Sequence, residues 1–177
     1  VVDSLLTDAM CEYVILHTLR YHRNQPELEK QQKSHTWNDL SDKQIHAKDQ
    51  TIGFLGMGEL GKACATILAE MKFSVYGWSR SPKNISGVSC FHGTEGLKTV
   101  LQKSKILICL LPLTKETKGI LNACLFSKLP KGAYLINAGR GQHLVEEDLL
   151  SALDIGQLSY ATLDVFNEEP LPVEHPF

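Results

Sequence analysis

The stretch from Thr51 to Ala63, T-I-G-F-L-G-M-G-E-L-G-K-A, constrains the fold more than any other part of the chain. Three glycines follow an apolar run with the spacing G-x-G-x-x-G. This pattern allows a tight strand-to-helix turn, a close approach of the backbone to a pyrophosphate, and close packing of the helix on the strand. We predict a dinucleotide site at the start of that helix, formed by Gly56, Met57, Gly58, Glu59, Leu60 and Gly61.

Two other interpretations of this turn are a P-loop and a tight packing turn without any ligand. The same letters also fit G-x-x-x-x-G-K, the start of a nucleotide-binding P-loop. A P-loop needs Ser or Thr after its lysine to hold magnesium, and Ala63 follows Lys62 here. The P-loop is therefore excluded, whereas a tight packing turn without any ligand stays open.

After residue 50, sequence patterns typical of strands alternate with patterns typical of helices. Such alternation implies parallel strands joined by right-handed crossovers. We therefore predict an α/β fold, a Rossmann-type doubly wound parallel sheet with an N-terminal crossing helix. The expected strands are 51–55, 73–78, 88–90, 106–111, 133–137 and 160–165, and the expected helices are 7–23, 59–71, 94–103, a broken 115–127, and 145–154.

The 177 residues fit a single cofactor-binding domain with three parts. Residues 1–50 would form the N-terminal helix, which ends near Pro26, and a polar wrapping connection anchored by Trp37. Residues 51–166 would form the Rossmann core, and residues 167–177 an extended exit hinge.

Composition excludes several classes of partner. A net charge of −2 gives no basic face for nucleic acid. The longest apolar run, Ile106 to Leu111, is far shorter than a membrane span. The five cysteines are scattered, with no C-x-x-C pair, which is typical of buried thiols in a reducing compartment. We expect a cytoplasmic protein with no metal site.

The second expected strand ends in a basic loop, G-W-S-R-S-P-K. An NAD site usually has an acidic side chain here, which accepts hydrogen bonds from the ribose hydroxyls. This loop has no acid but two hydroxyls, a guanidinium and an ammonium, which suit the extra phosphate of NADP. We predict NADP(H) as the cofactor, with NAD as an alternative, held by Ser79, Arg80, Ser81 and Lys83. A solvated basic loop is the other interpretation.

Three further patches follow the fourth, fifth and sixth expected strands. The carboxyl ends of parallel strands meet at one edge of such a sheet, where ligands bind. We predict that these patches face the cofactor crevice and contribute Leu111, Pro112, Thr117, Ala138, Gly139, Arg140, Asp164 and Glu169.

The motifs N-A-G-R-G and L-D-V-F-x-x-E-P-L, at residues 137–141 and 163–171, resemble those of the D-isomer-specific 2-hydroxyacid dehydrogenases. The stretches W-S-R-S, L-L-P-L-T-x-x-T and L-P-x-G-A-Y-L-I-N are most similar to the glyoxylate/hydroxypyruvate reductase A branch. The resemblance covers essentially the whole chain. It implies an NADP-dependent reductase of 2-oxo acids such as glyoxylate or hydroxypyruvate.

The resemblance also implies roles for single residues. Arg140 would bind the carboxylate and the reacting carbonyl of the 2-oxo acid, and Asp164 would contact the nicotinamide carboxamide. Glu169 would partner a catalytic histidine and raise its pKa, so that the imidazolium can protonate the carbonyl oxygen. Related enzymes dimerise through their cofactor domains, so we expect a homodimer through the helix around Met10, Tyr13 and Leu16.

The family's catalytic histidine comes further beyond its glutamate than this sequence extends, because only eight residues follow Glu169. His175 corresponds to a linker position in the family, so we do not expect it to be catalytic. We expect a cofactor domain whose substrate domain lies outside this chain, which binds cofactor without turnover. The alternative is a non-catalytic dinucleotide-binding or scaffold fragment.

Overall fold

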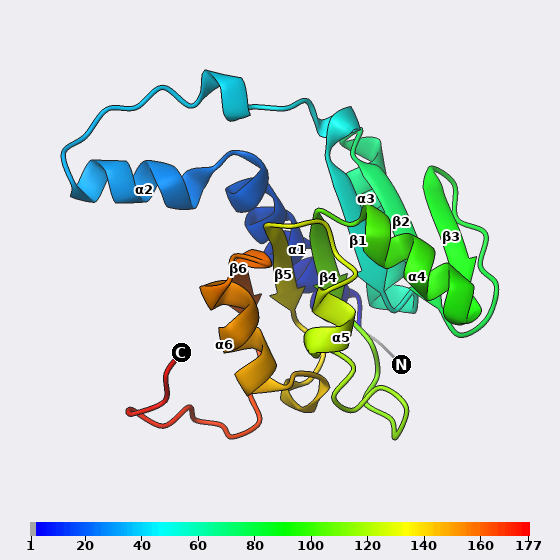
Figure 1. The fold of residues 1–177 in the computed structure, drawn as a ribbon. Helices are drawn as coiled ribbons and strands as arrows, with labels where there is room; N and C mark the ends of the chain where they lie inside the picture. Colours follow the sequence, from blue (N-terminus) through cyan, green and yellow to red (C-terminus); the bar gives the residue numbers. More distant parts are fainter. Residues whose placement is uncertain (1–2) are drawn as a thin grey trace.

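The computed structural model describes residues 3–177 and contains a six-stranded, wholly parallel sheet (Figure 1). The strand order is β3-β2-β1-β4-β5-β6. The chain starts with β1 in the middle of the sheet, adds β2 and β3 on one side, and then adds β4, β5 and β6 on the other side. This arrangement confirms the predicted doubly wound α/β fold. The strands are β1 (Thr51–Leu55), β2 (Ser74–Ser79), β3 (Val88–His92), β4 (Ile106–Cys109), β5 (Ala133–Asn137) and β6 (Leu158–Leu163).

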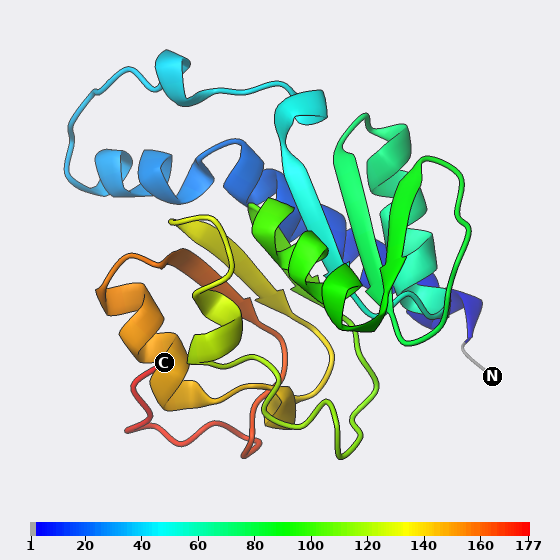
Figure 2. The ribbon, with the colours of Figure 1, turned by 45° about the vertical axis from the view of Figure 1, so that its right-hand side comes forward.

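Helices cover both faces of the sheet (Figure 2). Helices α1 (Ser4–His22) and α3 (Glu59–Glu70) pack on one face, and α4 (Gly93–Lys103), α5 (Ala123–Phe126) and α6 (Glu146–Asp154) cover the other. Strand β4 shows why both faces need cover, because all four of its residues are buried. Ile106 and Ile108 join the core under α1 and α3, while Leu107 and Cys109 join the core on the opposite face.

The connection before the sheet differs from the expectation. A second helix, α2 (Gln25–Lys33), begins directly after α1, so Pro26 does not end the helical region. Asn24 turns the chain with a φ of 55°, and Pro26 lies in the first turn of α2, where its missing N–H costs nothing. The connection before the sheet therefore contains a helix, Gln25–Lys33, that the sequence pattern did not predict.

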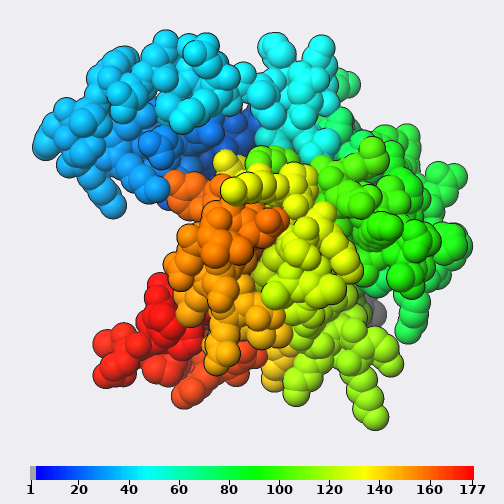
Figure 3. All heavy atoms as spheres, in the orientation of Figure 1, coloured from blue at the N-terminus to red at the C-terminus, as the bar shows by residue number. Residues whose placement is uncertain are grey.

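Trp37 does not anchor this connection, since 95% of its side chain is exposed. We call α2 and the segment up to residue 40 the arm. In Figure 1 the arm loops away from the sheet before the chain returns through the 3-10 turns Ser41–Lys43 and Ala47–Asp49 to β1. In the space-filling view it forms a lobe at the upper left (Figure 3).

The broken helix expected over 115–127 is also wrong in its first half. Only Ala123–Phe126 is helical, capped by the Asn122 side chain, which accepts from the Leu125 N–H at 3.0 Å. The preceding residues form turns, and Gly119 has a φ of 64° that a helix would not tolerate. The other elements match the expected ranges within two residues at each end, except that α1 starts three residues early.

The segment after β6 contains no helix or strand and returns along the start of α6. The Asn167 side-chain amide donates to Glu146 Oε1 at 2.9 Å, and His175 Nε2 lies 3.2 Å from Glu146 Oε2. Residues 167–177 therefore lie against the sheet domain at two points.

Candidate functional site

A cavity of about 650 Å³ opens at the carboxyl ends of β1, β2 and β4, at the point where the strand order reverses. Ligands of doubly wound sheets bind at this position. Ten of the predicted cofactor residues line the cavity, namely Gly56, Met57, Gly58, Ser79, Arg80, Ser81, Lys83, Leu111, Pro112 and Thr117. Sequence motifs from three separate loops thus converge on one site.

The three glycines of the turn have different surroundings. Gly56 has a φ of 104°, and a Cβ there would lie 2.7 Å from the Leu110 carbonyl oxygen. A Cβ on Gly61 would lie 1.9 Å from the Gly56 carbonyl oxygen. A Cβ on Gly58 would meet nothing within 4 Å, although Gly58 lines the cavity. The protein itself requires the first and third glycines, whereas the second leaves open space on the cavity side.

Helix α3 begins at Glu59. In its first backbone hydrogen bond, the Lys62 N–H donates to the Gly58 carbonyl at 2.8 Å. The amides of Glu59, Leu60 and Gly61 precede that bond, so the helix offers them no acceptor. Free amides and the positive end of the helix dipole form a site for phosphate groups. These three predicted residues lie in the first turn of α3 and not in the cavity lining.

The rim of the cavity at the end of β2 is basic. Arg80, Ser81 and Lys83 are exposed there. The buried Ser79 hydroxyl donates to the Ser81 carbonyl at 2.7 Å, so it shapes the loop. The Trp78 indole N–H donates to the Gly93 carbonyl at 2.8 Å and fixes a side wall. The rim presents two cations to solvent at the position where an NAD site has an acid.

The opposite wall is the loop after β4. The Thr117 hydroxyl donates to the Pro112 carbonyl and accepts from the Thr114 N–H, both at 2.8 Å. Glu116 lies on the same wall, and the hydrogen bond from Thr114 and the charge of Arg80 hold the pKa of its carboxyl below the usual value. Glu116 was not among the predicted site residues, because an acid inside a turn motif carries no periodic signal.

Arg140 and Glu169 line a second cavity of about 340 Å³, together with residues of the two loops that follow β5 and β6. Arg140 Nη1 donates to the Gly139 carbonyl at 2.6 Å, and Glu169 Oε1 accepts from the Phe166 N–H at 2.9 Å. The remaining lining residues are Gly141, Gln142, Val165, Phe166 and Asn167. The structure therefore brings the two predicted catalytic side chains to one cavity.

Asp164 lines neither cavity. It follows β6, where its N–H donates to the Asn137 carbonyl at 3.0 Å. Burial, with a smaller effect from the charge of Asp164, raises the pKa of Tyr13 to about 12, so Asp164 lies near α1. His175 contacts Glu146 at 3.2 Å and lines neither cavity.

Two buried side chains hold the loop that carries Arg140. Asn137 Oδ1 accepts from the Gly139 N–H at 3.3 Å, and its Nδ2 donates to the Arg140 carbonyl at 3.2 Å. His143 Nδ1 accepts from the Arg140 N–H at 3.1 Å. Ala138 extends the sheet, with its N–H donating to the Cys109 carbonyl at 3.2 Å. No sequence pattern indicated the role of His143, because its second partner, the Pro112 carbonyl, is 31 residues away in the chain.

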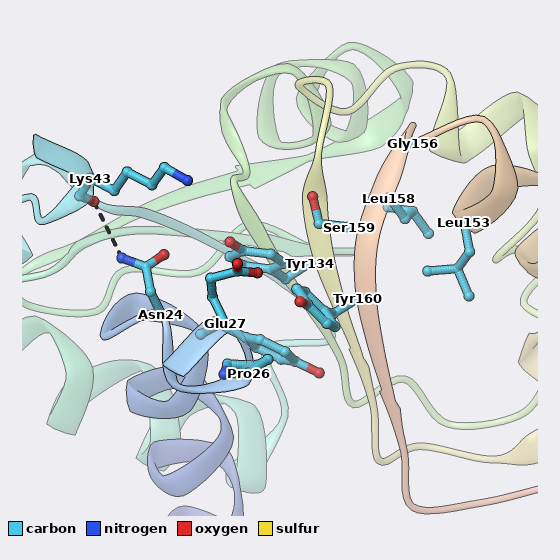
Figure 4. A pocket seen from close by; sticks show the side chains of 11 residues that line it. Asn24, Pro26, Glu27, Lys43, Tyr134, Leu153, Gly156, Leu158, Ser159 and Tyr160 are labelled. Atoms are coloured by element: carbon cyan, nitrogen blue, oxygen red, sulfur yellow. Dashed lines mark hydrogen bonds between the residues drawn. The ribbon is translucent and has the colours of Figure 1, made fainter. Parts of the chain in front are cut away.

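A third cavity of about 430 Å³ lies at the opposite edge of the sheet, between the elbow of α1 and α2 and the first residues of β5 and β6 (Figure 4). Tyr21 and Tyr134 stack there with ring centroids 4.7 Å apart, and Tyr160 lies beside them. The Asn24 side chain donates to the Lys43 carbonyl at 3.4 Å across its rim. None of the predicted site residues lines this cavity.

Over residues 3–177, no cluster of three or more His, Cys, Asp or Glu side chains could hold a metal ion. In the same range, no helix combines the length and the apolar character needed to span a membrane.

This geometry agrees with the comparisons with known proteins. The model for the D-isomer specific 2-hydroxyacid dehydrogenase, NAD binding domain, matches residues 15–177. The chain therefore belongs to the NAD-binding domains of the D-isomer specific 2-hydroxyacid dehydrogenases, as the motifs predicted.

Two curated relatives are named glyoxylate/hydroxypyruvate reductase A. The one from Yersinia enterocolitica is 51% identical and the one from Serratia proteamaculans 50% identical, each over 176 residues. These matches cover 99% of this chain but 55% of each relative. The chain spans about half the length of the curated relatives that it matches.

Solved structures of related proteins have the same fold. The NADPH-dependent glyoxylate/hydroxypyruvate reductase from Sinorhizobium meliloti, in complex with NADP and sulfate, is 45% identical with a TM-score of 0.94. That match covers 100% of this chain and 57% of the solved one. A D-isomer specific 2-hydroxyacid dehydrogenase from Xanthobacter autotrophicus, in complex with NADPH and MES, is 43% identical with the same TM-score, covering 98% and 71% of the two chains.

The glycine turn yields a stability prediction. Gly61→Ala should lower the free energy of unfolding by about 1–3 kcal/mol, because its methyl group collides with the Gly56 carbonyl. Gly58→Ala is the matched control and should change the free energy of unfolding by less than about 0.5 kcal/mol. Urea denaturation of both variants measures the difference. Equal stabilities would contradict the close contact between α3 and β1.

Proposed function

We propose that this chain is the NADPH-binding domain of a reductase that converts 2-oxo acids, such as glyoxylate or hydroxypyruvate, into 2-hydroxy acids. The observation that carries this proposal is the basic rim of Arg80 and Lys83 beside the open space at Gly58, in one cavity. The NADP and NADPH bound to the two related structures support the choice of cofactor. NAD is the alternative.

Three groups of the cofactor are assigned to parts of this chain. The free amides of α3 receive the pyrophosphate, and Arg80 and Lys83 receive the 2′-phosphate, which Arg80 can grip through two parallel hydrogen bonds. Asp164 is assigned to the nicotinamide carboxamide. Ala138 and Gly139 carry the chain from the cofactor side to Arg140.

The second cavity is assigned to the 2-oxo acid. Bound NADPH would supply the hydride. Arg140 would hold the substrate carboxylate and stabilise the negative charge that develops on the carbonyl oxygen. Glu169 would orient a protonated histidine and raise its pKa so that it can donate a proton to that oxygen. Among residues 3–177, no histidine hydrogen-bonds Glu169, whose carboxylate accepts from Phe166 instead.

We also propose a homodimer and a cytoplasmic location. The dimer is supported by apolar side chains at the start of the chain, where Leu16 is 61% exposed and Trp37 95% exposed. A reducing compartment is supported by the five free cysteines, three of which are buried.

The cofactor assignment predicts that NADPH binds at least tenfold more tightly than NADH, a gap of about 1.4 kcal/mol. Arg80→Gln should weaken NADPH binding about tenfold or more and leave NADH binding unchanged, since the lost hydrogen bonds involve only the 2′-phosphate. Lys128→Gln, which removes an exposed charge outside the cavity, is the control. Calorimetric titration gives the dissociation constants. Equal affinities of the parent chain for NADPH and NADH would overturn the assignment.

The substrate assignment predicts that the 177 residues alone bind NADPH without reducing glyoxylate or hydroxypyruvate. A longer protein, which also contains the regions that the curated relatives have beyond this chain, should reduce glyoxylate or hydroxypyruvate. The loss of NADPH absorbance measures this reaction. Arg140→Ala in the extended protein should lower kcat/KM at least about 10²-fold, as loss of a stabilising cation does. An extended protein that binds NADPH but reduces no 2-oxo acid would favour the non-catalytic alternative.

The dimer prediction concerns the N-terminal region. Light scattering at micromolar concentration should give the mass of two chains. Leu16→Glu together with Trp37→Ser should give the mass of one, because a buried charge and a lost aromatic contact both oppose association. Ile155→Glu, at an exposed site beyond α6, is the control and should leave the mass unchanged. A monomeric parent chain would refute the prediction.

A further inference from the structure

His143 is a fully buried histidine that joins the loops of the two cavities at the carboxyl edge of the sheet. It ends the 3-10 turn Gly141–His143, directly after Arg140 and its loop. Its Nδ1 lies 3.1 Å from the Arg140 amide nitrogen, and its Nε2 lies 3.3 Å from the Pro112 carbonyl oxygen. The imidazole therefore spans the space between the loop after β4 and the loop after β5.

The hydrogen bonds define the protonation state of this ring. A backbone amide can only donate, so Nδ1 must accept and carries no proton. A carbonyl oxygen can only accept, so Nε2 carries the proton and donates it to Pro112. Burial, and to a smaller extent the charge of Arg140, lowers the pKa of His143. The ring is neutral near pH 7, with each nitrogen bonded to a different loop.

The surroundings of His143 leave little freedom. A Cβ on Gly139 would lie 2.9 Å from His143 Nδ1, so the loop packs directly on the ring. The Cys109 thiol lies 4.0 Å from the same nitrogen, and burial raises its pKa to about 12, which keeps it uncharged. Arg140 and Cys109 are the titratable groups that contact His143 or act on its charge.

The Arg140 guanidinium depends on this loop for its position. Its side chain is exposed, and its hydrogen bond goes to the Gly139 carbonyl of the same loop at 2.6 Å. Pro112, on the other side of the ring, belongs to the wall of the cofactor cavity. A shift of His143 would therefore change the distance between the two cavities.

We propose that His143 is a positioning residue, which sets Arg140 at a fixed place relative to the cofactor cavity through a neutral imidazole bridge from the Arg140 amide to the Pro112 carbonyl. This inference rests on the proposed function, because it assigns the second cavity to the 2-oxo acid. A leucine would fill the same space but would leave the Arg140 amide and the Pro112 carbonyl unpaired.

Three substitutions separate the two ends of the bridge. The asparagine oxygen of His143→Asn can take the place of Nδ1 and accept from Arg140, but it cannot reach Pro112. The amide nitrogen of His143→Gln can take the place of Nε2 and donate to Pro112. His143→Leu keeps neither bond. His46→Leu, at an exposed histidine before β1, is the control.

The experiment measures KM for glyoxylate or hydroxypyruvate and the dissociation constant for NADPH in the protein extended by the regions of its curated relatives. His143→Leu and His143→Gln should raise KM about tenfold or more, since small misplacements of a binding group are costly, and His143→Asn should recover most of the loss. The dissociation constant for NADPH should rise about threefold to tenfold in His143→Leu and His143→Asn and recover in His143→Gln. His46→Leu should change neither.

Wild-type constants in His143→Leu would overturn the proposal, and so would equal losses in all three variants, which would mean that the ring only fills space. A parent protein that reduces no 2-oxo acid would refute the proposed function instead. The bridge is then tested by the nitrogen chemical shifts of His143 and the amide exchange of Arg140 in the chain itself. A proton on Nε2 and a slowly exchanging Arg140 amide support the bridge, and a proton on Nδ1 overturns it.

Discussion

The first turn of α3 rests directly on the end of β1, where a Cβ on Gly61 would lie 1.9 Å from the Gly56 carbonyl oxygen. This contact determines where the helix starts and therefore where its free amides point. The positive φ of Gly56 lets the chain turn within this space, against the backbone of Leu110 on β4's exit loop. The cofactor cavity then follows, since its walls are the loops after β1, β2 and β4.

Charge divides this edge of the sheet into two regions. The cofactor cavity has Arg80 and Lys83 on one side and Glu116 on the other, and the second cavity has Arg140 and Glu169. A phosphate group entering the first cavity meets two cations and one carboxylate, so that Arg80 and Lys83 outweigh Glu116. The two regions are connected through buried polar side chains, Asn137 and His143, rather than through the sheet alone.

Sequence patterns predicted the parts of the molecule that obey local rules. Strands such as β4 are continuous apolar runs because both faces are buried, and the glycine turn has a fixed spacing because the backbone geometry requires it. The arm was missed because Pro26 starts α2 as readily as it ends a helix, and an exposed Trp37 resembles a buried one in sequence. Glu116 lies in a turn without periodic signal, and it faces Arg80 across the cavity only in the folded chain. The bridge of His143 could not be found either, since one of its two partners, Pro112, is distant in the chain.

The proposed function depends above all on a dinucleotide that binds at the carboxyl edge, with its pyrophosphate on α3. The most direct measurement is a nuclear magnetic resonance titration of the nitrogen-15-labelled chain with NADP. We expect saturable shifts of the amides of Gly58, Glu59, Leu60 and Gly61 and of the Arg80 side chain if the dinucleotide binds there. Shifts confined to the third cavity, around Tyr21, Tyr134 and Tyr160, or no shifts at all, would contradict it.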